Sequence, residues 1–271
     1  MKIGNYNYNV IFFGEKHGIQ ENFELYINEI KNFNEDNLVC ILEVGYSSGV
    51  YIDNYINGNE IFPLKDFVLE FKNTMMGSFE FGRFIKKLKE HNKTLKNKIH
   101  IIGIDVEYQK KIALKVLKYV NENGLKYEKN NIEKNIDNVK HLNNLSESNY
   151  EIEREKILYN NFVTYYKKEK DYICFMGLYH TKYHSEDNNL VKMLEKDKIN
   201  FISIDIIYKN TFRTIMENEG FKVIKINDAI MLEEYDFYPD KNIYLKNEYE
   251  GAVLIKNGKE LKMIKGIVYK K

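Results

Sequence analysis

A glutamate and a histidine stand directly after the first apolar run of the chain. In the segment VIFFGEKHGIQE, Glu15 and His17 are two residues apart and follow the glycine that ends the run. If the backbone stays extended there, the two side chains share one face. An imidazole titrates near neutral pH, and a neighbouring carboxylate can orient the ring. The pair therefore suits proton transfer from water, or the binding of a metal ion.

Three later apolar runs end in the same way. VCILEVG carries Glu43, IHIIGID ends in Asp105, and YICFMGLYH leads to His180. Each acid could instead cap the helix that follows it, which is an ordinary role at such a place. Burying these groups unpaired is costly, so we expect them to meet one another, a ligand or a metal. Four consecutive runs with this ending favour a functional cluster over coincidence.

The apolar runs alternate with helical patterns along the chain. They are short and apolar on both faces, which is typical of an α/β fold with a mostly parallel central sheet and helices on both faces. In such sheets the ligand site lies beyond the carboxyl ends of the strands. We expect strands over 8–14, 37–44, 98–105, 171–177, 200–208, 221–228 and 251–258, and helices over 20–33, 47–58, 63–73, 78–92, 108–124 and 187–197.

No repeat, low-complexity block or linker divides the chain, so we expect a single α/β domain over residues 1–271. A polar helical stretch at about 125–170 is the expected insertion, in the form of a hairpin or an arm. Its plain interpretation is a solvated arm. The alternative is a surface for a partner, in which case the chain would be a binding module without enzymatic activity.

Charge and targeting signals exclude several function classes. Lys and Arg number 41 against 40 Asp and Glu, a net charge of +1, so no basic field favours nucleic acid. No secretory signal and no apolar window of transmembrane length is visible, and we expect a cytoplasmic protein without a membrane partner. We expect a small-molecule substrate as the partner. None of these patterns carries information on the oligomeric state.

Four blocks of the sequence carry a family resemblance. FFGEKHGIQE, ILEVGYSSGVYIDNYINGN, KKLKEHN with IHIIGIDVEY, and CFMGLYHTKYH resemble, in this order, the blocks of the erythromycin esterase-like and ChaN-like superfamily, which is related to the TIKI-type proteins. One residue, Lys16, separates the glutamate from the histidine, as in the ChaN-like form, where the esterase-like form has two. The last block reads YHTKYH instead of His-Asn-x-His. These departures argue against a macrolide substrate.

The resemblance implies a hydrolase that acts on an ester or a related bond of a small molecule. By position, His17 resembles the general base on water, and Glu15 the acid beside it. Glu43 resembles the second-strand acid, and either carboxylate can orient the ring of His17. His180 resembles the later histidine, which we expect to donate to the leaving group or the oxyanion. No Gly-x-Ser-x-Gly segment supports a serine nucleophile.

Metal binding is the second hypothesis for the same four side chains. Glu15, His17, Glu43 and His180 could ligate a divalent transition metal with an open position for water. Such a site would make a metal-dependent hydrolase or, as the ChaN-like resemblance implies, a metal or haem carrier. No compact motif such as His-Glu-x-x-His supports it, and we rank it below metal-free hydrolysis.

Four further residues are candidates for substrate binding. Asp105 matches the Gly-x-Asp block and could equally be structural. Arg83 and Tyr46 lie near the matched blocks and could bind an anionic group, although an arginine on a helix is more often a surface residue. His184 follows His180 by four residues and shares its face if the stretch is helical.

Overall fold

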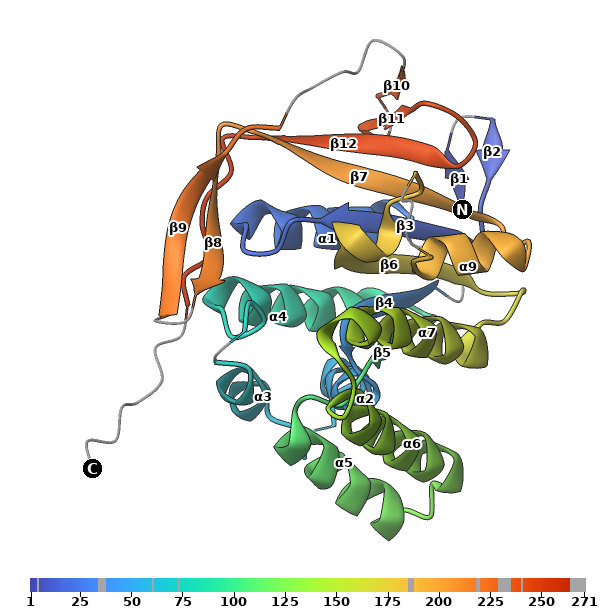
Figure 1. Cartoon of the computed structure of the whole chain (residues 1–271), viewed down its shortest axis with the longest axis vertical. Coiled ribbons are helices and arrows are strands. Elements are labelled where there is room, and N and C mark those ends of the chain that lie inside the picture. The colour runs from blue at the N-terminus through green and yellow to red at the C-terminus, as the bar shows by residue number, and fades with distance from the viewer. Residues whose placement is uncertain are drawn as a thin grey trace.

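Six apolar segments of the chain lie side by side as parallel strands. The computed structural model describes residues 1–3, 5–33, 38–59, 61–72, 74–184, 188–217, 220–228, 235–239 and 241–263. The strands stack in the order β12-β7-β3-β6-β4-β5 (Figure 1). They are β3 (Val10–Glu15), β4 (Leu38–Gly45), β5 (His100–Asp105), β6 (Asp171–Gly177), β7 (Phe201–Lys209) and β12 (Glu250–Lys256).

Short antiparallel strands extend one edge of the sheet, and two more pair with each other near the N-terminus. β11 (Ile243–Leu245) pairs with β12, and β10 (Asp236–Tyr238) pairs with β11 at the same edge. β1 (Lys2–Ile3) and β2 (Tyr6–Asn7) form a separate pair. The predicted mostly parallel sheet is therefore confirmed, with an antiparallel extension at one edge.

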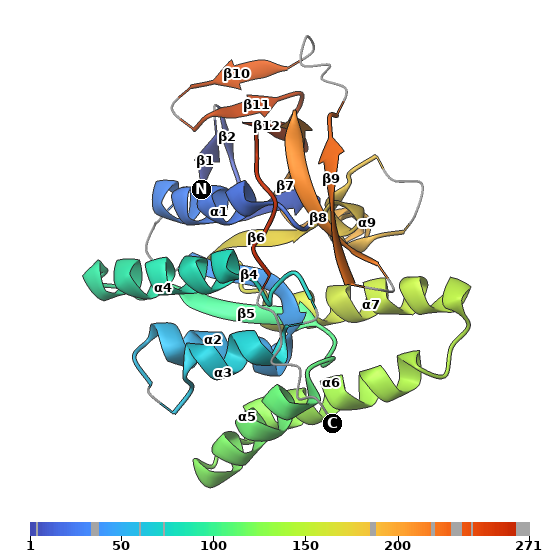
Figure 2. The ribbon, with the colours of Figure 1, turned by 90° about the vertical axis from the view of Figure 1, so that its left-hand side faces the viewer.

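Helices cover both faces of the sheet, as predicted. Figure 2 shows α1, α2 and α4 on one side and α7 and α9 on the other. Alternate residues of each strand feed the two cores: Ile11 and Phe13 of β3 belong to the first, and Val10 and Phe12 to the second. The helices are α1 (Gln20–Asn32), α2 (Tyr46–Ile56), α3 (Leu64–Glu70), α4 (Phe79–Thr94), α5 (Lys110–Glu122), α6 (Lys126–Leu142), α7 (Glu147–Tyr165), α8 (Leu178–Thr181) and α9 (Leu190–Lys196).

The predicted elements match these bounds to within a few residues at each end. Positions 37, 73 and 187 of the predicted elements lie outside the described residues. Within the described part of the chain, no helix has both the length and the apolar character needed to span a bilayer.

The polar stretch at about 125–170 is built differently from the expected solvated arm. It forms α6 and α7, and Leu158 and Phe162 of α7 are fully buried in the second core. Ile132 of α6 is also fully buried. The prediction of a solvated arm is therefore wrong: the stretch has a polar average composition, but part of its apolar side chains, Ile132, Leu158 and Phe162 among them, are buried in the cores of the domain.

A hairpin of β8 (Thr211–Glu217) and β9 (Gly220–Ile226) leaves the sheet after β7. The strand predicted over 221–228 was expected to close the sheet or cover its edge. Among the residues that the structure describes, it instead pairs only with β8. The Thr214 N–H donates to the carbonyl of Gly18, 2.8 Å away, in the loop after β3. Gly18 has φ +93°, and a Cβ there would lie 1.9 Å from the Thr214 oxygen, so this contact requires glycine. The hairpin is thereby fixed at the carboxyl end of β3.

The packing of α2 on β5 provides a test of the fold. A Cβ on Gly49 of α2 would lie 2.2 Å from the backbone nitrogen of Gly103 in β5. A Cβ on Gly82 of α4 would meet only Val68, at 3.7 Å. We predict that Gly49→Ala lowers the free energy of unfolding by about 1–3 kcal/mol, because the helix must move away from the sheet.

The matched variant Gly82→Ala should raise the free energy of unfolding by about 0.5–1 kcal/mol through helix propensity alone. Urea unfolding of both variants measures the two effects. Equal changes in the two proteins would mean that α2 does not approach β5 this closely.

Candidate active site

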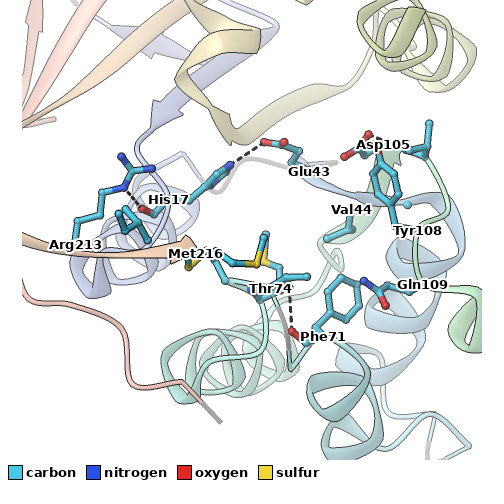
Figure 3. A pocket seen from close by; sticks show the side chains of 15 residues that line it. His17, Glu43, Val44, Phe71, Thr74, Asp105, Tyr108, Gln109, Arg213 and Met216 are labelled. Carbon is cyan, nitrogen blue, oxygen red and sulfur yellow. Dashed lines mark hydrogen bonds and ion pairs between the residues drawn. The ribbon is translucent and has the colours of Figure 1, made fainter. Parts of the chain in front are cut away.

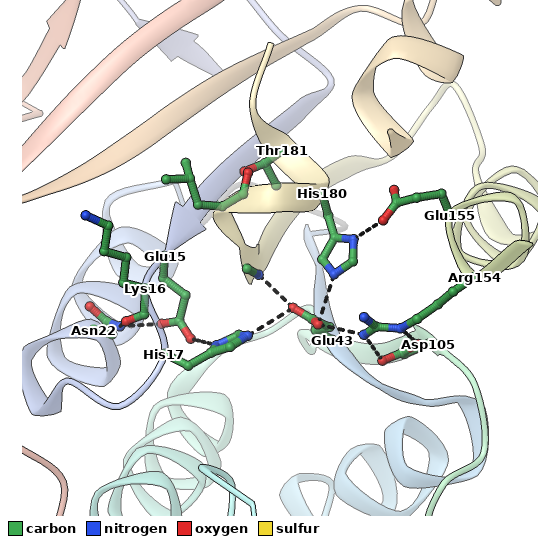
Figure 4. Close-up of polar contacts among 12 residues, drawn as sticks. Glu15, Lys16, His17, Asn22, Glu43, Asp105, Arg154, Glu155, His180 and Thr181 are labelled. Carbon is green, nitrogen blue, oxygen red and sulfur yellow. Dashed lines mark hydrogen bonds and ion pairs between the residues drawn. The ribbon is translucent and has the colours of Figure 1, made fainter. Parts of the chain in front are cut away.

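The carboxyl ends of four neighbouring strands bring the predicted side chains together (Figure 4). Glu15 ends β3, Glu43 lies near the end of β4, and Asp105 ends β5. His180 follows β6 in the short helix α8. Since β3, β6, β4 and β5 are adjacent in the sheet, these groups face one another although up to 165 residues separate them along the chain.

Glu15 holds the ring of His17 from behind. Its Oε1 lies 2.5 Å from Nδ1 of His17. Its Oε2 accepts hydrogen bonds from Nδ2 of Asn22 at 2.5 Å and from the hydroxyl of Tyr26, both on α1. Glu15 is buried, whereas the His17 side chain is 36% exposed. The carboxylate therefore fixes the ring so that its Nε2 points away from α1 and toward Glu43 (Figure 4).

Glu43 is the shared acceptor at the centre of the site. Its Oε1 lies 2.8 Å from Nη2 of Arg154 and 3.1 Å from Nε2 of His180. Its Oε2 accepts the Gly177 N–H at 2.6 Å and lies 3.6 Å from Nε2 of His17. A Cβ on Gly177 would lie 3.1 Å from that nitrogen, so the last residue of β6 has little space for a side chain.

His180 supports Glu43 from the side opposite His17. Its Nδ1 bonds Glu155 of α7, and its Nε2 bonds Glu43. Glu155 also accepts the Leu190 N–H at 2.7 Å, at the start of α9. Both ring nitrogens of His180 face carboxylates and the side chain is 4% exposed. This arrangement differs from the expected contact with a leaving group, because both ring nitrogens already bond carboxylates.

Arg154 of α7 joins the site, and the sequence analysis did not single it out. Its Nε and Nη2 donate to the two oxygens of Asp105 at 3.1 and 2.6 Å, and Nη2 also reaches Glu43. Asp105 is thus placed as an arginine partner. A usable signal was present: the chain has three arginines, Arg83, Arg154 and Arg213, among 41 basic residues. Arginine is favoured over lysine where a fork must bond carboxylates.

The mutual pairing shifts the pKa values of the cluster. Burial lowers the pKa of His17, but the hydrogen bond to Glu15 and the charges of Glu43 and Glu15 outweigh it and raise the value to about 9. Burial also lowers the pKa of His180, but the charges and hydrogen bonds of Glu43 and Glu155 outweigh this effect and raise the value to about 10. Burial raises the pKa of Glu43, yet His180, His17 and Arg154 hold it well below its ordinary range. His17 therefore titrates above the near-neutral value expected from sequence.

Two pockets meet at this cluster. One, here the apolar pocket, has a volume of about 460 Å³, and Figure 3 shows it from close by. The other, here the polar pocket, has a volume of about 510 Å³. His17, Glu43 and Arg213 line both. The apolar pocket is further lined by Val44, Phe71, Met75, Met76, Ile215 and Met216, among others, and the polar pocket by Glu15, Lys16, Glu151, Arg154, Tyr179 and His180, among others.

Arg213 of β8 is the second side chain that the sequence analysis missed. Its Nε donates to the backbone oxygen of His17 at 2.6 Å (Figure 3). The hairpin thus contacts the site at His17 and, through Thr214, at Gly18. No strand was expected over 211–217, so nothing in the sequence directed Arg213 toward the strand ends.

Three candidates lie outside the two pockets. Arg83 of α4 is 58% exposed and pairs with Glu80 at 2.8 Å. Tyr46 opens α2, is buried, and stacks on Tyr165 with ring centroids 5.0 Å apart. His184 is exposed and lies 2.7 Å from a carboxylate oxygen of Glu250. The structure does not bring these three side chains to the cluster, and each already has a partner elsewhere.

The side chains of the cluster are a poor donor set for a metal ion. Among the described residues, no group of three or more His, Cys, Asp or Glu side chains is arranged to hold one. Glu43 and Asp105 already bond the guanidinium of Arg154, and both nitrogens of His180 face carboxylates. A metal ion at this place would be repelled by the positive charge of Arg154. Because these donors are already paired, the arrangement does not fit a divalent ion.

Comparisons with known proteins identify the fold. No family model and no curated protein sequence matches the chain. Among the solved structures that resemble it are a succinoglycan biosynthesis protein, a protein from Bacillus cereus, and a mutant of the erythromycin esterase EreC in its open conformation. Their TM-scores are 0.67, 0.66 and 0.61, at 12%, 11% and 10% identity. They cover 95%, 94% and 93% of this chain and 90%, 90% and 91% of their own. The chain has the erythromycin esterase-like fold, as the resemblance of its sequence blocks implied.

The ion pairs of Arg154 provide a test of the cluster. We predict that Arg154→Met lowers the free energy of unfolding by about 3 kcal/mol, because Glu43 and Asp105 lose their buried cation. The control is Lys156→Met on the same helix, where Lys156 pairs with Glu153 at an exposed position. The control should change stability by less than about 0.5 kcal/mol. Urea unfolding compares them, and a loss no larger for Arg154 than for Lys156 would contradict the geometry.

Proposed function

We propose that this chain is a hydrolase that cleaves an ester or a related bond of a small molecule with water activated at His17. One observation carries the proposal: His17 lines both pockets, and its ring lies between two carboxylates, Glu15 at Nδ1 and Glu43 at 3.6 Å from Nε2. This is the arrangement of a general base whose orientation is set by a carboxylate. The similarity to an erythromycin esterase adds support at the level of the fold alone.

The reaction begins with a water molecule bound between Nε2 of His17 and Oε2 of Glu43, which are 3.6 Å apart. Unprotonated Nε2 takes one proton while the water oxygen attacks the carbonyl carbon of the ester. Glu43 accepts a hydrogen bond from the second water proton and so aims the oxygen. Glu15 stabilises the imidazolium that forms, through the hydrogen bond at Nδ1.

The negative charge that develops on the carbonyl oxygen needs a donor. Arg213 is the cation that lines both pockets beside His17, and its guanidinium can donate to this oxygen. The imidazolium of His17 then returns its proton to the leaving oxygen, which completes hydrolysis without a covalent intermediate. His180 acts as a positioning residue that keeps Glu43 ionised and in place.

Substitution of His17 tests the general base directly. His17→Asn should lower kcat/KM for ester hydrolysis at least 100-fold, about the contribution expected of a general base. The melting temperature at neutral pH should fall, but less than in Arg154→Met, because the protonated ring pairs with Glu15 and Glu43 while its side chain is 36% exposed. His141→Asn, at an exposed position on α6, serves as the matched control and should keep full activity. Equal activity of the two variants would remove His17 from the mechanism.

The second prediction concerns pH. The base works only when it is unprotonated, and the pKa of His17 is raised to about 9. Activity should therefore rise with pH, roughly tenfold per unit between pH 6 and 8, and level off near pH 9. Initial rates with the His17→Asn background subtracted give the profile. A plateau that is already complete at pH 7, or a fall over this range, would show that a different group is the base.

A further inference from the structure

The apolar pocket has walls that water activation does not require. Val44 lies near the end of β4 and Val106 follows the end of β5, and Met75 and Met76 come from the loop between α3 and α4. Met216 closes the opposite side from β8 (Figure 3). Charged side chains line this pocket only where it meets the cluster, at His17, Glu43, Asp105 and Arg213. A ligand that fills it must present hydrocarbon to these walls.

The size of the pocket sets a lower limit for that hydrocarbon. A closed apolar cavity of about 150 Å³ accommodates one benzene ring. The apolar pocket, at about 460 Å³, has about three times that volume, and His17 is one of its lining residues. It therefore has room for an aliphatic chain or ring of roughly six or more carbons.

The β8 wall combines exposure with a fixed position. Met216 is 62% exposed although it lines the pocket, so part of its thioether side chain has no cover in the free protein. The same strand is bonded to the loop of His17 through Arg213 and Thr214. Hydrocarbon packed against Ile215 and Met216 is thereby held at a set distance from Nε2. Methionines on both walls can adapt to chains of different shape.

We propose that the apolar pocket binds the aliphatic part of an ester substrate and that Ile215 and Met216 determine the length of chain accepted. The proposal rests on the hydrolase function above, since it assigns the substrate class of that site. The polar pocket takes the other, hydrogen-bonding part of the substrate, and the ester bond lies between the two at His17.

The experiment compares p-nitrophenyl acetate with p-nitrophenyl hexanoate. Each buried methylene is worth about fourfold in kcat/KM, so the hexanoate should be preferred at least about tenfold. Met216→Glu should abolish the preference, because the new carboxylate raises KM for the hexanoate more than for the acetate. The matched control is Val223→Glu on β9, which is 49% exposed on the same hairpin but does not line the pocket.

Calorimetric binding of n-hexanol to the uncleaved protein separates this proposal from the proposed function. Hexanol should bind the wild type and the Val223 variant equally, and at least tenfold more weakly to Met216→Glu. If esters are cleaved without preference for the hexanoate, the substrate class is wrong and the hydrolase stands. If no ester is cleaved but hexanol binding depends on Met216, the hydrolase is wrong and the apolar site stands. Absence of both the preference and the binding overturns the proposal.

Discussion

The site depends on one buried carboxylate that four groups share. Glu43 receives the guanidinium of Arg154, the ring of His180 and the N–H of Gly177, and it faces the ring of His17. An ionised carboxylate is tolerated in a buried place only when such partners surround it. The partners come from the loop after β3, from β6, α7 and α8, so compensation of this single charge requires the parallel sheet to assemble in register. The site therefore forms only when the sheet has folded.

The same pairing sets a limit on the chemistry. Carboxylates on either side of His17 stabilise its imidazolium, so only about 1% of the free protein carries the unprotonated base at pH 7 if its pKa is about 9. The same carboxylates hold the base in a fixed place: Glu15 bonds the ring of His17, and His17 lines both pockets. A substrate that places hydrocarbon in the apolar pocket would bring its ester to that edge. The β8–β9 hairpin, bonded to the His17 loop, links substrate packing to the base.

Sequence patterns predicted the parallel core because strands buried on both faces leave continuous apolar runs. They also predicted Glu15, His17, Glu43 and His180, because polar residues at the ends of such runs must converge. Arg154 and Glu155 were not predicted. In a helix of mostly polar composition, the sequence does not distinguish the few charged side chains that point inward from the many that are exposed. Arg213 escaped because β8 pairs with β9 alone and its alternation is that of a half-exposed hairpin. Arg83, Tyr46 and His184 were chosen by nearness in sequence, and the fold separates them from the cluster.

The most direct test is a titration of the histidine rings by ¹H–¹⁵N correlation spectroscopy in the wild type and in Glu43→Gln. If Glu43 organises the site, His17 and His180 titrate near pH 9 and 10 in the wild type. Both should move toward about 6.5 when the carboxylate becomes an amide. Wild-type rings that titrate near 6.5, or values that the Glu43 substitution leaves unchanged, would contradict the account.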